Sequence, residues 1–334
     1  MASPAPGHPV RSVSPDTNSV WKEPVLDIGV AGYRGAMSTI DPENLTLTAV
    51  KGVRVGHWTD PGAATGVTVV DLPEPNVTSV EVRGAAPGTR ELALLAPGMT
   101  VQTVQAIVLA GGSAFGLAAA DGVVRRLEQT DRGYPTAAGV VPIVASAVLF
   151  DLAVGDSSVR PTADNGVAAF ESASRGPVEM GQLGAGTGAT VAKWRGVDAV
   201  KPGGLGSYAT TCRGATIAAL AVVNALGDVF TIEGDPLTGG IPVPGPPAMS
   251  PTLGEQTTLV VLATDAKLTR PELGRLIVRA HDAFAVTLRP AHTRYDGDVV
   301  FAVSCGDMEA DHDALGEAAF EVVGRSIERA ITSA

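Results

Sequence analysis

The 334-residue sequence has few cysteines, few basic residues and no long apolar run. Its two cysteines, Cys212 and Cys305, are too few for a disulfide framework and indicate reduced thiols in a cytoplasmic protein. Lys and Arg number 24 against 35 Asp and Glu, and the net charge of −11 argues against nucleic acid or an anionic membrane as a partner. No run reaches the length of a membrane span, and the N-terminus lacks the apolar core of a signal peptide.

The composition that remains is typical of a folded, turn-rich chain. Hydrophobic residues make up 45% of it and charged residues only 18%, which provides enough apolar surface for one large domain or two ordinary ones. Residues 1–44 have the composition of a tail and lead-in, and the periodic segments begin at Leu45. Strands and helices come in clusters rather than in strict alternation, so we expect sheets covered by helices.

The clearest periodicity lies in the C-terminal part of the chain. A helix is expected over residues 268–290, where Thr269 and Glu272 have the spacing of a capping box and an apolar stripe follows. The stretch "TTLVVLATD", residues 257–265, is a candidate central strand. The other expected elements are strands at 45–58, 64–72 and 77–84, a strand, turn and helix at 104–129, strands within 139–155 and 208–232, a helix at 164–174, a strand at 298–306 and a helix at 313–332.

Two carboxylates in "RYDGDVVF" are candidates for chemistry. Asp296 and Asp298 are two residues apart, so both side chains face one side if the chain there is extended. Like charges so placed repel each other unless a cation lies between them, whether a metal ion, a Lys or Arg side chain, or an α-ammonium group. A solvated hairpin turn at the Asp-Gly step is the alternative.

Other motifs carry a weaker signal. The five histidines form no HExxH motif, and the cysteines lack the spacing of a zinc site. The stretch "AGGSAFG" fits neither a nucleophile elbow nor a P-loop. Its Gly111 and Gly112 either bring backbone N–H groups to an anion or allow tight packing of a strand against a helix.

Thr257 and Thr258 begin the apolar strand directly after a stretch rich in Pro and Gly, which includes residues 234–252. Threonine favours strands, which accounts for the pair without any function. A threonine hydroxyl becomes an effective nucleophile when the residue is N-terminal, because the α-amine, with an unperturbed pKa of about 8, then serves as the base. A cut before Thr257 would create that amine, and the preceding stretch is suited to such a cut.

A family resemblance rests on motifs that follow one another in order from Leu45 to the C-terminus. They are "GVRVGHWTD" with "ATGVTVV", "RGAAPGTRE", "LAGGSAFGLAAADGV", "VPIVASAVLFDL", "LAVVNALGDV", "TTLVVLATDA" and "RPAHTRYDGDVVFAVS". Together they resemble the P1-type peptidases, self-cleaving N-terminal-nucleophile hydrolases that include L-aminopeptidase/D-esterases, β-aminopeptidases and nylon-oligomer hydrolases. The resemblance implies an α/β fold, a single αββα sandwich over residues 45–334, which uses no cofactor or metal and assembles into a homo-oligomer, a tetramer.

The resemblance also implies that the precursor cuts itself. The cut falls between Gln256 and Thr257 and gives an α-chain, residues 1–256, and a β-chain, residues 257–334. Thr257 is then the nucleophile at the start of the β-chain. The cleaved protein is expected to hydrolyse amide bonds in short peptides or in linear ω-amino-acid oligomers of the nylon type.

Four further residues match positions of the family's site. Asp296 and Asp298 match the acidic pair that supports the nucleophile in the nylon-oligomer branch, to which the chain is closest in motif. Asn224, in "VVNALG", matches an oxyanion-site asparagine. Lys193, in "VAKW", matches a lysine near the active site of the same branch.

Two residues depart from the family pattern. Gln256 stands where the nylon-oligomer branch has asparagine, or some relatives have glycine, before the nucleophile. Phe150 stands where several relatives have a tyrosine whose hydroxyl helps bind the oxyanion, a hydrogen bond that phenylalanine cannot donate. Backbone N–H groups at Gly111 or Gly112 are the expected replacement.

Two alternatives remain open from the sequence. The first is an uncleaved family member with weak or no catalysis, which the departures at Gln256 and Phe150 favour. The second is a metal-dependent hydrolase that uses Asp296, Asp298 and His292.

Overall fold

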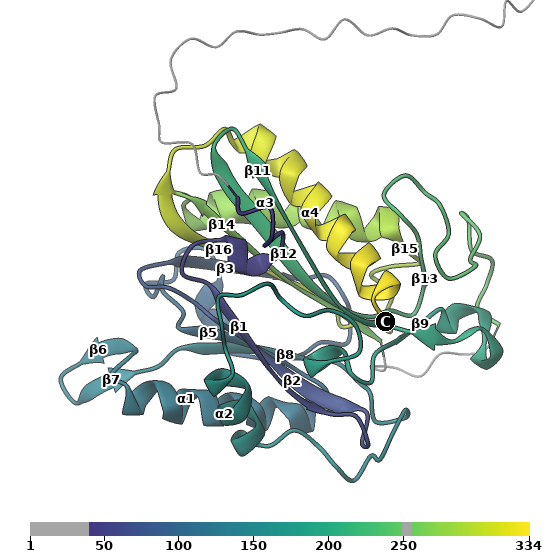
Figure 1. Cartoon of the computed structure of the whole chain (residues 1–334), viewed down its shortest axis with the longest axis horizontal. Helices are drawn as coiled ribbons and strands as arrows, with labels where there is room; N and C mark the ends of the chain where they lie inside the picture. Colours follow the sequence, from purple (N-terminus) through teal and green to yellow (C-terminus); the bar gives the residue numbers. More distant parts are fainter. Residues whose placement is uncertain (1–39, 249–255) are drawn as a thin grey trace, which may run out of the picture. The chain divides into compact units, whose positions relative to one another are not determined.

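Two five-stranded sheets packed face to face, each covered by helices on its outer face, make up the fold (Figure 1). The computed structural model describes residues 40–248 and 256–334. The expected tail, residues 1–44, lies outside these ranges except for its last five residues, and so does part of the Pro-rich stretch before Thr257. The four layers confirm the predicted αββα sandwich.

The first sheet carries two helices, α1 (Ala119–Gln129) and α2 (Ala163–Glu171). The strands β5 and β8 are parallel and α1 lies between them in the chain, whereas the other neighbours are antiparallel. Both faces of the sheet are covered, which explains why β2, β5 and β8 are buried along their whole length. In spatial order the strands are β1 (Arg54–Asp60), β2 (Thr65–Asp71), β5 (Ala106–Ala110), β8 (Val144–Val148) and β4 (Gly88–Arg90).

The second sheet carries α3 (Arg270–Thr287) and α4 (His312–Thr332). Its parallel pair, β14 and β16, is likewise connected through a helix, α3. Along β14 the side chains alternate: Val260 and Leu262 pack toward the helices, while Leu259, Val261 and Ala263 pack between the sheets. In spatial order the strands are β11 (Gly204–Cys212), β12 (Ala215–Asn224), β14 (Thr257–Ala266), β16 (Val299–Met308) and β3 (Val77–Val82).

Short elements connect these layers. The two-stranded ladders are β6 (Tyr134–Thr136) with β7 (Gly139–Val141), β9 (Thr190–Val191) with β10 (Lys201–Pro202), and β13 (Asp228–Val229) with β15 (Leu288–Arg289). The 3-10 turns are η1 (Leu47–Ala49), η2 (Ala93–Leu95), η3 (Ser113–Ala118), η4 (Gly184–Gly186), η5 (Lys193–Arg195) and η6 (Val197–Ala199). No helix within the described ranges has the length and apolarity that crossing a membrane requires.

Most expected elements are present with shifted ends. The capping box at the start of α3 forms as predicted, since the Glu272 carboxylate accepts hydrogen bonds from the Thr269 N–H and hydroxyl, both at 2.7 Å. The strand expected over residues 45–58 is wrong in its first half. There the chain forms η1, fixed by a hydrogen bond of 2.8 Å from the Leu47 N–H to the Ser207 hydroxyl, and β1 begins only at Arg54.

Candidate active site

The register of the second sheet brings five of the predicted site residues together. Thr257 is the first residue of β14, and its partner in the antiparallel register is Asn224, the last residue of β12. On the other side, β16 runs parallel to β14, so the residues just before β16 lie beside the start of β14. Gln256 forms a parallel bridge with Asp296, and Asp298 lies one residue before β16.

Gln256 and Thr257, on either side of the predicted cut, are both buried, each with 3% of its surface exposed. The Thr257 hydroxyl donates a hydrogen bond of 2.5 Å to the carbonyl oxygen of Gln256. The same oxygen accepts a hydrogen bond of 2.8 Å from the Gly297 N–H. A hydroxyl therefore lies against a carbonyl that a backbone donor already polarises.

Gly297 is required at its position by close approach. A Cβ atom there would lie 2.8 Å from the Thr257 hydroxyl oxygen and 2.9 Å from the carbonyl oxygen of Ala86. Ala86 is in turn held by a hydrogen bond of 2.9 Å from its N–H to the carbonyl of Asp296. The space beside the hydroxyl is therefore closed to any side chain.

The two aspartates differ in their surroundings. Asp298 is anchored at both oxygens: Oδ1 accepts from the Thr258 N–H at 2.7 Å, and Oδ2 accepts from the N–H of His292 at 3.1 Å and lies 2.8 Å from Nδ1 of its ring. For Asp296, Oδ2 accepts from the Thr293 N–H at 2.7 Å. Burial, with the charge of Asp298 as a second cause, raises the pKa of Asp296 to about 6. Asp296 therefore exchanges a proton close to neutral pH.

Asn224 connects Lys193 and Phe150 to the site through hydrogen bonds of its side-chain amide. Its Oδ1 accepts hydrogen bonds from Lys193 Nζ at 2.8 Å and from the Thr190 N–H at 3.0 Å. Its Nδ2 donates to the main-chain carbonyl of Phe150 at 3.1 Å. These contacts fix the orientation of the amide, with Nδ2 as the donor group.

Gly111 and Gly112, the predicted oxyanion donors, have their N–H groups hydrogen-bonded within the protein. The Gly111 N–H donates to the carbonyl of Gly66 at 2.9 Å, and the Gly112 N–H donates to Asp151 Oδ1 at 2.7 Å. Both N–H groups therefore already have acceptors, and the structure gives no support to that prediction. A Cβ atom on Gly111 would lie 1.9 Å from Asp151 Oδ2 and 2.5 Å from the Thr65 hydroxyl oxygen, so close approach of these side chains accounts for the glycine.

The metal alternative also finds no support in the geometry. In residues 40–248 and 256–334, no group of three or more His, Cys, Asp or Glu side chains is arranged to hold a metal ion. His292 and Asp298 are instead hydrogen-bonded to each other. Cys212 and Cys305 form no disulfide.

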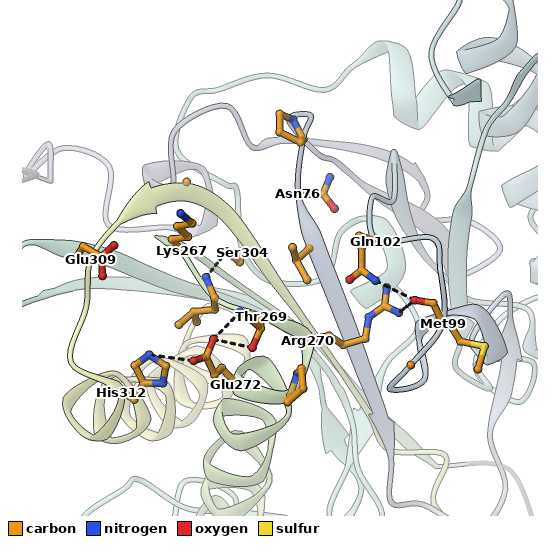
Figure 2. A pocket seen from close by; sticks show the side chains of 16 residues that line it. Asn76, Met99, Gln102, Lys267, Thr269, Arg270, Glu272, Ser304, Glu309 and His312 are labelled. Atoms are coloured by element: carbon orange, nitrogen blue, oxygen red, sulfur yellow. Dashed lines mark hydrogen bonds and ion pairs between the residues drawn. The ribbon is translucent and has the colours of Figure 1, made fainter. Parts of the chain in front are cut away.

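A surface groove with a volume of about 830 Å³ lies away from this cluster (Figure 2). It is lined by residues around the start of α3 and the end of β14, about 30 Å from Thr257 at the rise of a β-strand. Figure 2 shows Glu272 between Thr269 and His312. Its carboxylate accepts a hydrogen bond from the Thr269 hydroxyl and lies 3.6 Å from Nε2 of His312. The groove is therefore separate from the cluster around Thr257.

The sequence does not predict two contributors to the cluster, the N–H groups of Gly297 and Thr258. It associates His292 with Asp298 only as a ligand in the metal alternative, not as a hydrogen-bond partner. Gly297 and His292 both lie in "HTRYDGD", the stretch that contains the two aspartates. Their roles depend on backbone direction and on the pairing of β14 with β16, for which the sequence has no local signal.

Comparison with known proteins assigns the family. The sequence model of peptidase family S58 matches residues 46–334, which is most of the chain. The chain belongs to peptidase family S58. As an S58 member it is a peptidase, a hydrolase of amide bonds.

Curated relatives agree with this assignment. The S58 chain is 42% identical over 299 residues to an uncharacterized aminopeptidase of Mycobacterium leprae (strain TN), covering 79% of this chain and 80% of the relative. It is 44% identical over 296 residues to an uncharacterized aminopeptidase of Mycobacterium tuberculosis (strain ATCC 25618 / H37Rv), covering 80% and 84%. A 6-aminohexanoate-oligomer endohydrolase of Kocuria sp. (strain KY2) is 29% identical, with coverage of 77% and 74%.

Solved structures confirm the fold of this S58 peptidase. A β-aminopeptidase of Burkholderia sp. superposes with a TM-score of 0.69 at 22% identity, covering 90% of this chain and 89% of the other. The L-aminopeptidase D-Ala-esterase/amidase of Ochrobactrum anthropi, described as a variant of the Ntn-hydrolase fold, superposes with a TM-score of 0.69 at 23% identity, covering 91% and 89%. At these identities the likeness establishes the N-terminal-nucleophile hydrolase type of fold and nothing about substrates.

Proposed function

We propose that this S58 peptidase is an N-terminal-nucleophile amidase that cuts itself between Gln256 and Thr257. The observation that carries the proposal is the contact of 2.5 Å between the Thr257 hydroxyl and the carbonyl oxygen of Gln256, on a carbonyl that the Gly297 N–H also holds. The hydroxyl is therefore held beside the carbonyl group that an N-to-O acyl shift must attack, which supplies the proximity that this step needs.

Self-cleavage proceeds through attack of Thr257 Oγ on the carbonyl carbon of Gln256. The carbonyl oxygen becomes an oxyanion, and the Gly297 N–H stabilises it. Asp296, with a pKa near 6, accepts the hydroxyl proton and delivers it to the leaving nitrogen as the C–N bond breaks. Water then hydrolyses the ester, which leaves residues 1–256 with a new carboxyl end and residues 257–334 with a free amine on Thr257.

Substrate hydrolysis uses the same hydroxyl with a new base. The α-amine of Thr257 takes the proton as Oγ attacks the substrate carbonyl, and Asn224 Nδ2 donates to the oxyanion. Lys193 stabilises the Asn224 amide through its contact of 2.8 Å with Oδ1. Water releases the acyl group, and the neighbouring Asp296 and Asp298 keep the amine oriented.

Short peptides and linear amides with a free amino end are the proposed substrates, ω-amino-acid oligomers among them. The aminopeptidase names of the mycobacterial relatives support the first class, and the 6-aminohexanoate-oligomer endohydrolase supports the second. The free amino end is a cation, and it suits a site with two buried carboxylates. We further propose a cytoplasmic homo-oligomer, a tetramer, as the family resemblance implies.

An uncleaved, weakly active protein is the second candidate. Phe150 favours it, because this residue supplies the site with a main-chain carbonyl, whereas a tyrosine there would add a hydroxyl donor. One observation favours self-cleavage instead: Gln256 Oε1 is buried without a hydrogen-bond partner among the described residues. A buried unpaired amide oxygen destabilises the precursor, and a cut after Gln256 would free this side chain to reach a hydrogen-bond donor or water.

Intact-protein mass spectrometry of the purified chain tests the proposal, with Thr257→Ser and Thr257→Ala as a matched pair. We expect the wild type and Thr257→Ser to give two fragments that meet between residues 256 and 257, and Thr257→Ala to stay whole. A wild-type chain that stays whole after long incubation, with no amidase activity, would establish the second candidate instead.

A further inference from the structure

His292 makes more contact with the acidic pair than any role in packing requires. Its backbone N–H and its ring Nδ1 both approach Oδ2 of Asp298, at 3.1 and 2.8 Å. Asp298 receives a further hydrogen bond from the Thr258 N–H at its other oxygen. Two backbone N–H groups thus donate to this carboxylate, and in the tautomer with a hydrogen on Nδ1 the ring of His292 adds a third hydrogen bond.

The ring of His292 is fixed from its other side by α3. It stacks on Phe284 with ring centres 5.2 Å apart, and it meets His281 edge to face at 4.8 Å. Its Nε2 is buried and has no hydrogen-bond partner within the described ranges. For packing alone an apolar side chain would serve better, because an unpaired buried nitrogen is destabilising. The contact of Nδ1 with Asp298 is therefore the reason for a histidine here.

The backbone of His292 has a conformation that serves the same contact. Its φ angle is 54°, in the left-handed region that residues with a side chain rarely adopt. Such strained residues persist where the surrounding structure uses the conformation. Here it lets one residue direct both a backbone and a ring donor at a single oxygen.

We infer that His292 is a positioning residue of the active site: it fixes the Asp298 carboxylate, which through the Thr258 N–H fixes the start of β14 and the place of the Thr257 hydroxyl. The two aspartates then have different tasks. Asp298 is an anchor, and Asp296 is the member of the pair that exchanges the proton. This inference rests on the proposed function.

Three variants at His292 test it, each chosen because its new residue tolerates a left-handed backbone. In His292→Asn the amide nitrogen replaces the Nδ1 donor, whereas His292→Gly removes the side chain and His292→Asp keeps the size of asparagine but sets a like charge against Asp298. The rate of self-cleavage is followed by intact mass. We expect His292→Asn to stay within about threefold of the wild type, and the other two to be slower by about tenfold or more, as for a lost hydrogen bond to a charged group.

Thermal unfolding of each variant in a Thr257→Ala background shows whether the precursor is folded. If His292→Gly does not fold, the pair of isosteric variants, His292→Asn and His292→Asp, still decides the matter. Folded Gly or Asp variants that cut as fast as His292→Asn, or a folded Asn variant as slow as the others, would overturn the inference and leave the proposed function standing. An uncut wild type would overturn both.

Discussion

Replacement of Gly297 by alanine is the perturbation whose effect follows most directly from the geometry. The added methyl group would lie 2.8 Å from the Thr257 hydroxyl oxygen, whereas ordinary contacts begin at 3.4 Å. The carbonyl oxygen of Ala86, at 2.9 Å, is also closer than an ordinary contact and belongs to the backbone, so the side-chain hydroxyl is the group that gives way. The hydroxyl must therefore move by about 0.6 Å, the difference between the two distances.

A displacement of this size is large for a reacting atom. Since misplacement by about 1 Å costs about a hundredfold in rate, we expect Gly297→Ala to slow self-cleavage by about tenfold or more. The φ angle of Gly297 is not in the left-handed region, so alanine itself is tolerated by the backbone. The slower rate should therefore come with a folded precursor.

The assay is the fraction of cut chain against time, measured by intact mass after dilution from a freshly purified precursor. Gly274→Ala is the matched control, because a Cβ atom on this glycine of α3 meets no atom within 4 Å. That substitution should leave the rate unchanged and stabilise the helix by about 0.5–1 kcal/mol. A folded Gly297→Ala precursor that cuts within twofold of the wild type would refute the reasoning.

Four further predictions concern acid–base behaviour, stability and turnover. Self-cleavage should accelerate as pH rises through about 6, since Asp296 must be ionised to accept a proton. Asp296→Asn should abolish this rise. A flat pH profile in the wild type would contradict the role of Asp296 as the proton acceptor. In the Thr257→Ala precursor the same raised pKa means that the folded state binds the Asp296 proton more tightly than the unfolded state does. The free energy of unfolding should therefore fall by up to about 3 kcal/mol as pH rises from 4 to 6. Urea unfolding at each pH measures this change. Arg270→Met should lower the free energy of unfolding, measured in urea, by about 3 kcal/mol or more. The reason is that the buried guanidinium donates to five carbonyls, those of Thr78, Leu94, Ala96, Met99 and Val101. A change below about 1 kcal/mol would show that water replaces the guanidinium as the donor. Phe150→Tyr should raise kcat on an amino-acid p-nitroanilide by about tenfold or more if the new hydroxyl reaches the oxyanion, and an unchanged kcat would remove that role from this position.

The elements that the sequence predicts well are those with a local cause. The helix α3 begins where the capping box of Thr269 and Glu272 predicts, and β14 coincides with a continuous apolar run because both faces of its sheet are covered. The strand expected from residue 45 fails in its first half because the Leu47 N–H finds a partner 160 residues away, at Ser207.

The candidate site also has a part that the sequence predicts and a part that it does not. Resemblance selects Thr257, Asp296 and Asp298, and the spacing of the two aspartates predicts that they interact. Burial is the main cause of the raised pKa of Asp296, and the charge of Asp298 is the second. What holds them cannot be deduced locally. The donors to Asp298 come from β14 and from a left-handed residue at position 292, and they meet only because β14 and β16 are parallel and adjacent.

The position of β14 in its sheet has a consequence for the cleaved protein. A cut before Thr257 places β14, α3, β16 and α4 in the 78 residues of the smaller product, while β12, which pairs with β14 along eight residues, belongs to the larger one. The two products then share one sheet and one core, like the subunits of an obligate heterodimer. Maturation would thereby turn a unimolecular folding reaction into a bimolecular one, so that the mature enzyme, once denatured, reassembles at a rate that depends on its concentration.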